Sequence, residues 1–170
     1  MNSILKALKS TQDLIDGLSK IIDHEMIIFC IGTPKCKMDS VGPAIGSKLK
    51  DLGFKGTVYG TIEDPINALN IEQKILEVKN KYPKNKILAI DSAVSYDNSR
   101  VGAIYLTASP ILPGAGVGKK IVPIGDYSIR AVIATNDTFV HNSGPIDRDS
   151  EILLDIVVQT VSNSIIAFCK

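Results

Sequence analysis

The chain contains several short runs of apolar residues, each ended by glycine, proline or polar residues. Such runs predict β-strands, and a run that is apolar at every position is typical of a strand buried on both faces of a parallel sheet. Five strands are expected, at Met26–Ile31, Thr57–Thr61, Lys86–Asp91, Arg100–Thr107 and Ser128–Thr135.

Between these runs, apolar residues recur every three or four positions, which predicts amphipathic helices. The expected helices cover residues 2–22, Ser40–Leu52, Pro65–Tyr82 and Ser150–Phe168. Asp64 is expected to cap the third of them, with proline at its first position. Because helices alternate with strands, the predicted fold class is α/β, a three-layer α-β-α sandwich with a mostly parallel sheet.

Length, charge and cysteine count restrict the number of domains, the expected partners and the cellular compartment. A length of 170 residues suits a single domain over 1–170, and a net charge of +1 gives no strong field, so neither nucleic acid nor a membrane is an expected partner. The apolar runs are too short to span a bilayer, and the N-terminus lacks a signal-peptide pattern. An odd count of three cysteines favours a reducing compartment, so a cytoplasmic location is expected. The amphipathic segment 2–22 can dock on its own domain or join two copies into a homo-oligomer.

Two acidic residues occupy positions where sites form in open parallel sheets. Asp91 is the last residue of the predicted strand Lys86–Asp91, and Asp39 ends the loop that leaves Met26–Ile31, at a helix N-terminus. The carboxyl ends of parallel strands meet at one edge of the sheet. If these two strands are neighbours, the two carboxylates face each other across a cleft.

Such a pair has a specific chemistry. Two adjacent carboxylates cannot both ionise cheaply, so one pKa rises and the pair shares a proton. One acid can then activate water while the other protonates an amide. The helix N-terminus favours the charged form of Asp39, which makes Asp39 the expected base and Asp91 the expected proton holder. The alternative is structural: Asp39 caps a helix, and Asp91 binds backbone amides in a loop.

Three segments resemble motifs of the germination protease family of spore-forming bacteria and occur in that family's order. In Gly32–Pro43, a glycine after the first strand precedes an aspartate that is followed, after two residues, by Gly-Pro. Ala89–Ala93 resembles the second aspartate motif, and Pro113–Lys120 the glycine-rich loop. Ile129–Thr135 fits the strand that follows. Within this group, the chain most resembles the short YyaC-type sporulation proteins.

This resemblance implies an aspartate-dependent endopeptidase that needs no metal or other cofactor. Asp39 and Asp91 stand at the family's two catalytic positions. The implied fold is the phosphorylase/hydrolase-like sandwich that hydrogenase maturation proteases share. The implied substrates are small acid-soluble proteins that coat spore DNA and are cleaved at germination, which places the protein in the forespore or spore core.

Further residues are expected near the substrate. Gly32 and the loop glycines Gly114, Gly116 and Gly118 would lie along an extended substrate, although glycines that only permit tight turns are the alternative. His141 follows the strand Ser128–Thr135 and could approach the same edge. A second resemblance, to hydrogenase maturation proteases that recognise nickel, leaves open an arrangement of two carboxylates and one imidazole around a metal. A binding or regulatory protein of the same fold, without turnover, is the remaining alternative.

Overall fold

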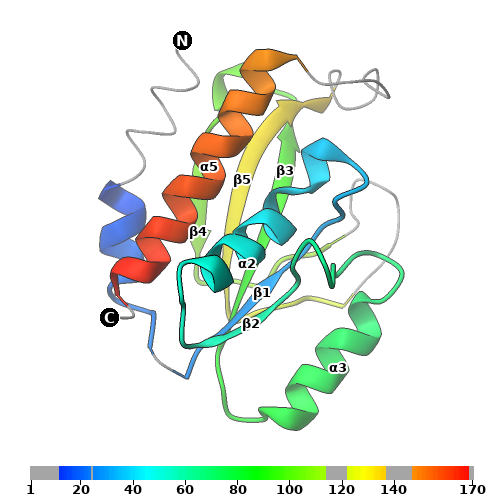
Figure 1. Cartoon of the computed structure of the whole chain (residues 1–170), viewed down its shortest axis with the longest axis vertical. Coiled ribbons are helices and arrows are strands. Elements are labelled where there is room, and N and C mark those ends of the chain that lie inside the picture. The colour runs from blue at the N-terminus through cyan, green and yellow to red at the C-terminus, as the bar shows by residue number, and fades with distance from the viewer. Residues whose placement is uncertain (1–11, 24, 114–121, 137–146, 169–170) are drawn as a thin grey trace.

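The computed structural model describes residues 12–23, 25–113, 122–136 and 147–168 (Figure 1). Residues 12–18 are helical. The strands are β1 Ile27–Cys30, β2 Thr57–Tyr59, β3 Ile87–Ser95, β4 Ile104–Thr107 and β5 Tyr127–Thr135. The α-helices are α2 Val41–Asp51, α3 Ile71–Lys81 and α5 Arg148–Ala167, and two short 3-10 helices are η1 Lys37–Asp39 and η2 Asn98–Arg100.

The five strands form one sheet in the order β2-β1-β3-β5-β4. All neighbouring pairs are parallel except β4, which runs antiparallel to β5 at one edge. The expected α/β class with a mostly parallel sheet is therefore confirmed. In particular, β1 and β3 are neighbours, which is the condition on which a meeting of Asp39 and Asp91 depends.

Helices cover both faces of the sheet, as a three-layer sandwich requires. Alternate residues of β1 belong to two separate apolar clusters: Ile28 and Cys30 pack with α2 and α5, whereas Ile27 and Phe29 pack with α3. Figure 1 shows α2 and α5 crossing one face of the sheet, with α3 set apart from them. Burial on both faces explains why the sequence of β1 is apolar at every position.

The first helix and α5 both pack against the core of this domain. Leu14 and Leu18 of the first helix are buried in the cluster that also holds α2 and α5, so this part of the helix docks on its own domain. The helix α5 is long and apolar enough to cross a membrane by length and composition. Its apolar face, which includes Val157 and Val161, is buried in the same cluster, and α5 is thus a core helix of the domain.

The third predicted helix begins later than expected. Instead of starting a helix at Pro65, the chain places Ile66 in an isolated parallel bridge with Ile31, where Ile66 is fully buried. The side chain of Asn70 then organises the turn: its Nδ2 donates to the Pro65 carbonyl at 3.0 Å, and its Oδ1 accepts from the Asn67 N–H at 2.9 Å. The cap-like Asp64-Pro65 pair was therefore misleading, because burial of Ile66 outweighs local helix propensity.

Two strand boundaries also differ from expectation. β3 continues four residues past Asp91, to Ser95, because β5 pairs with it over this whole length. Asp91 is therefore inside a strand and is not its last residue. β4 begins at Ile104, since Asn98–Arg100 form η2, which the Asp97 side chain caps by accepting from the Ser99 N–H at 2.9 Å.

Candidate active site

Asp91 lies on β3 just beyond the end of the shorter strand β1. Cys30, the last residue of β1, pairs with Ile90, and the Ile31 N–H donates to the Ile90 carbonyl at 2.8 Å. Beyond that bond β1 has ended, while β3 continues. Asp91 therefore lies at a stretch of β3 whose β1 side is left open for another segment of the chain.

The loop after β1 brings Asp39 to this open side. The chain turns at Gly32, which has a left-handed φ of 140°, and returns through η1, which contacts β3. The loop closes on itself because the Thr33 N–H donates to the Asp39 carbonyl oxygen at 2.9 Å. A Cβ atom on Gly32 would overlap that same carbonyl oxygen. Glycine is thus required here by backbone conformation and by close approach to Asp39.

Burial sets the ionisation of Asp39. The side chain is half-buried, and loss of solvent raises the pKa of Asp39 from 3.8 to about 6. The Thr33 backbone and the Ser92 side chain, as polar groups near the carboxylate, oppose this effect and lower the pKa of Asp39. The capping alternative does not describe this carboxylate, because Ser40 is the N-cap of α2 and no side chain caps that helix.

Asp91 responds to burial and to Asp39. Burial is the larger cause that raises the pKa of Asp91 to about 7, and the charge of Asp39 is the second. A charge effect of this kind requires the two carboxylates to be close. The backbone of Ser92 and the cation of Arg130 lower the pKa. The structure therefore brings together the two acids that the sequence singled out, and their catalytic roles remain a prediction.

Ser92 and Arg130 belong to this site and were not predicted from the sequence. Ser92 follows Asp91 directly and lowers the pKa of both acids, that of Asp39 through its side chain and that of Asp91 through its backbone. Arg130 of β5 is the residue paired in register with Asp91, so the two side chains leave the sheet on the same face. Only the parallel pairing of β3 with β5 reveals Arg130, and no spacing in the sequence signals it.

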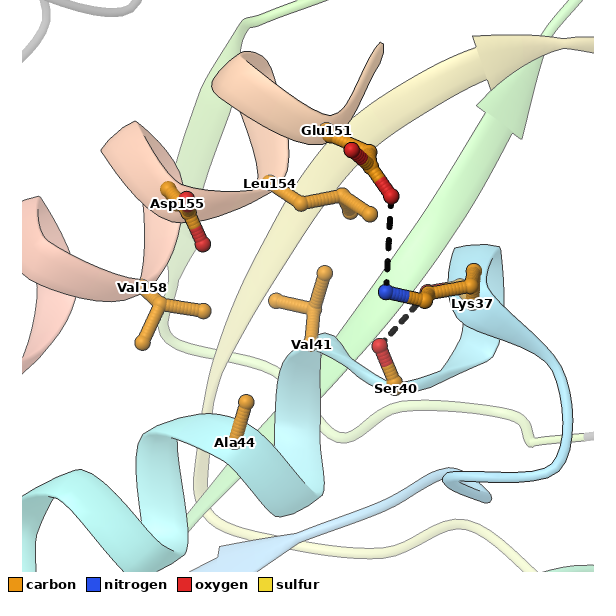
Figure 2. A pocket seen from close by; sticks show the side chains of 8 residues that line it. All are labelled: Lys37, Ser40, Val41, Ala44, Glu151, Leu154, Asp155 and Val158. Carbon is orange, nitrogen blue, oxygen red and sulfur yellow. Dashed lines mark hydrogen bonds and ion pairs between the residues drawn. The ribbon is translucent and has the colours of Figure 1, made fainter. Parts of the chain in front are cut away.

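The other side of η1 borders a cavity. A hollow of about 240 Å³ between α2 and α5 is lined by residues that include Lys37, Val41, Glu151 and Asp155. Figure 2 shows Lys37 extending from η1 toward Glu151 of α5, a separation of 3.5 Å. Both side chains are exposed, so this ion pair holds η1 only weakly. Neither Asp39 nor Asp91 lines the cavity, so it is separate from the carboxylate pair.

Four of the predicted substrate-binding residues, Gly114, Gly116, Gly118 and His141, lie outside the described residues. The described chain on either side of the glycine-rich stretch is joined by an antiparallel bridge between Ile111 and Ile124. Over the ranges that are described, no three histidine, cysteine or acidic side chains gather closely enough to hold a metal. His141, the third member of the expected metal arrangement, is not among the residues that were searched.

Comparison with known proteins gives a fold neighbour and a family. The chain is similar to the crystal structure of a [NiFe] hydrogenase maturation protease, HycI from Thermococcus kodakarensis KOD1, with a TM-score of 0.56 and 13% identity. The match covers 90% of this chain and 98% of that one, and at such low identity it shows the α/β fold alone. A relative from Bacillus subtilis (strain 168), the uncharacterized protein YyaC, is 33% identical over 129 residues. That alignment covers 75% of this chain and 62% of the relative, so the chain spans about three fifths of the relative's length.

The family is shown by a separate match. A family model described as "Protein of unknown function (DUF1256)" matches residues 3–166, which is nearly the whole chain. The carboxylate pair and both apolar clusters lie within the matched residues. The chain therefore belongs to the DUF1256 family.

Proposed function

We propose that this protein is an endopeptidase that uses Asp39 and Asp91 as a carboxylate pair sharing one proton. The observation that carries the proposal is that the charge of Asp39 raises the pKa of Asp91, at the edge of the sheet where sites form in this fold class. Strongly shifted acids that meet in this way are enriched at catalytic sites.

The shifted values suit the two acids to different tasks. With a pKa of about 6 for Asp39 and about 7 for Asp91, the pair carries one proton over the range between these values, held mainly by Asp91. The Asp39 carboxylate takes a proton from water as the water attacks the peptide carbonyl carbon. Asp91 supplies its proton to the leaving amine nitrogen, so the C–N bond breaks without release of an unstable anion.

The fold neighbour supports a proteolytic reaction, because HycI is a [NiFe] hydrogenase maturation protease. The motif resemblance described above supports the germination protease type. On that basis the substrates are small acid-soluble spore proteins or another sporulation protein, met in the cytoplasm of the forespore or the spore core.

The test is cleavage of a small acid-soluble spore protein by the purified chain. Defined fragments are expected from the wild type, and Asp39→Asn and Asp91→Asn should each cut at least about 100-fold more slowly, the lower range for general acid–base groups. Asp51→Asn is the matched control, since Asp51 is an exposed acid at the end of α2. Binding of the substrate without cleavage by any variant would favour the binding or regulatory protein instead.

A metal-recognising maturation protease is a second candidate, favoured by the fold shared with HycI. Its test is metal analysis of protein purified without added metal, together with the variant His141→Ala. A stoichiometric metal that the variant loses would support it. Cleavage that is unchanged by chelators and by His141→Ala would favour the carboxylate pair acting alone.

A further inference from the structure

Arg130 lies beside Asp91 in the sheet. The two residues are paired in register between β3 and β5, and neighbouring strands lie about 4.8 Å apart. Ile90 of β3 and Ile129 of β5, which precede them in the chain, are buried in the cluster that packs with α2 and α5. Because side chains alternate between the two faces of a strand, Asp91 and Arg130 both project from the opposite face. Arg130 is therefore the strand residue next to Asp91 on the side away from β1.

The face that carries Arg130 is open to solvent over β5. The apolar cluster on the α3 side includes Ile87 and Ala89 of β3 but no described residue of β5 or β4. Arg130 and Tyr105, its register partner on β4, are both exposed. A substrate that reaches Asp91 from this face would therefore meet the guanidinium of Arg130.

The positive charge of Arg130 is not neutralised by an ion pair. No acid of the described ranges lies within 4.0 Å of its guanidinium, whereas Lys37 and Arg100 are each paired with an acid, at 3.5 and 3.6 Å. Lys35 is exposed in the loop after β1, where no strand pairing fixes it beside Asp91. Arg130 is thus a cation that the sheet holds next to the carboxylate and that is available to a bound molecule.

The proposed cleavage creates a negative charge that neither acid neutralises. When water adds to the peptide carbonyl carbon, its proton passes to Asp39 and the carbonyl oxygen becomes an oxyanion. The proton of Asp91 goes to the amine nitrogen as the C=O bond re-forms and the C–N bond breaks. Cations and N–H donors aimed at such an oxyanion are a large source of rate in acyl transfer. A third group beside the two acids would therefore speed the reaction.

We propose that Arg130 is this third group: its guanidinium binds the carbonyl oxygen of the bond being cleaved and stabilises the oxyanion. This inference rests on the proposed function. The three groups then come from adjacent segments of the chain, Asp39 from the loop after β1, Asp91 from β3 and Arg130 from β5. A guanidinium suits the role because it stays charged over the whole range in which the two acids titrate, and because its N–H donors lie in one plane.

The test is cleavage by the full chain, with kcat and KM measured separately across the pH range. Arg130→Met removes the charge and keeps an unbranched side chain. It should lower kcat at the pH optimum by roughly 10- to 100-fold and change KM little, because the oxyanion forms only after the substrate has bound. The loss is smaller than for a donor in a closed site because Arg130 is exposed. Arg130→Lys keeps the charge and should retain most of the wild-type kcat.

Arg100→Met is the matched control, since it removes a cation that is paired with Asp97 and should leave kcat unchanged. An equal loss of kcat in Arg130→Met and Arg100→Met would overturn the inference, because it would indicate a general effect of surface charge. A role through Asp91 alone also gives a different result. In that case Arg130→Met would move the alkaline limb of the pH profile but keep the full kcat at the new optimum, and the inference would be wrong.

A binding measurement tests the contact without turnover. A substrate peptide in which a phosphonate replaces the bond to be cleaved carries the charge of the oxyanion and does not react. Arg130→Met should weaken its binding about tenfold, the effect of one hydrogen bond to a charged group. The affinity for the unaltered peptide, measured with Asp39→Asn to prevent cleavage, should change little. Equal weakening for both peptides would contradict a contact with the oxyanion.

The outcome for the wild type separates this inference from the proposed function. If the wild type cleaves no protein, the proposed function fails and the role of Arg130 fails with it. If the wild type cleaves and Arg130→Met keeps its full kcat, the carboxylate pair stands and only the role of Arg130 is overturned.

Discussion

Cys30 of β1 pairs with Ile90 of β3, and this is the last residue pair between the two strands. Asp91 is therefore the first residue of β3 that β1 does not reach, while β5 goes on pairing as far as Ser95. Because β1 is shorter than β3 and β5, Asp91 has no strand residue beside it on the β1 side, whereas on the other side it is paired with β5. The loop after β1 fills the open side with Asp39.

The raised pKa values make stability depend on pH. Both acids hold protons more tightly in the folded chain than at their ordinary pKa of 3.8, so the folded state binds more protons between about pH 4 and pH 7. The free energy of unfolding is therefore highest below this window and falls as the pH rises through about 6 and 7. Urea unfolding measured across this range should show the decline.

The same linkage predicts a stabilising substitution. Asp91→Asn removes a charge that is unfavourable in the folded state, so at pH 8 it should raise the free energy of unfolding by about 1–3 kcal/mol, less than the full pKa shift of Asp91 would give because the residue keeps some contact with solvent. At about pH 4.5 the variant and the wild type should differ little. If the free energy of unfolding depends on pH in the same way in Asp91→Asn, Asp51→Asn and the wild type, the charge of Asp91 is not unfavourable in the folded state.

Arg130 should control the proton of Asp91. Arg130→Met removes a nearby cation that lowers the pKa of Asp91, so that pKa should rise. The alkaline limb of the cleavage profile should then move up by roughly half a pH unit, a modest change because Arg130 is exposed. Arg130→Lys should behave like the wild type. Arg100→Met, which removes a cation paired with Asp97, is the control that should leave the profile in place.

Gly32 should be intolerant of any side chain. Gly32→Ala places a Cβ atom against the Asp39 carbonyl oxygen in a left-handed backbone, and a loss of stability above about 2 kcal/mol is expected. Gly53→Ala is a matched control, because Gly53 is also left-handed but has nothing within 4 Å of an added Cβ. It should cost about 1 kcal/mol. Equal losses in thermal unfolding of the two variants would mean that close approach to Asp39 adds nothing.

Much of this fold could be predicted from the sequence, because its strands are apolar on both faces and its helices carry regular apolar stripes. The apolar run of β1 and the stripe of α2 gave correct positions to within a residue or two. The sequence also singled out Asp39 by a helix start and Asp91 by the end of an apolar run, although β3 continues past Asp91 and the catalytic roles of the two acids remain a prediction. The glycine at position 32 was found as part of a motif, but its close contact with Asp39 became clear only in the structure.

The remaining features depend on contacts between distant segments. The later start of α3 follows from the bridge between Ile31 and Ile66, and the extension of β3 follows from its pairing with β5. Neither contact leaves a local pattern. Arg130 likewise joins the site through register alone, and Ser92 through the early end of β1.

The most direct test of the carboxylate pair is the titration of Asp91 by carboxyl-carbon NMR in the wild type and in Asp39→Asn. The wild type should show Asp91 titrating near 7 and Asp39 near 6. In Asp39→Asn the neighbouring charge is gone, and the pKa of Asp91 should fall while burial keeps it above 3.8. If Asp91 titrates at the same pH in both proteins, or if both acids titrate near 4 in the wild type, the two carboxylates do not act as a pair.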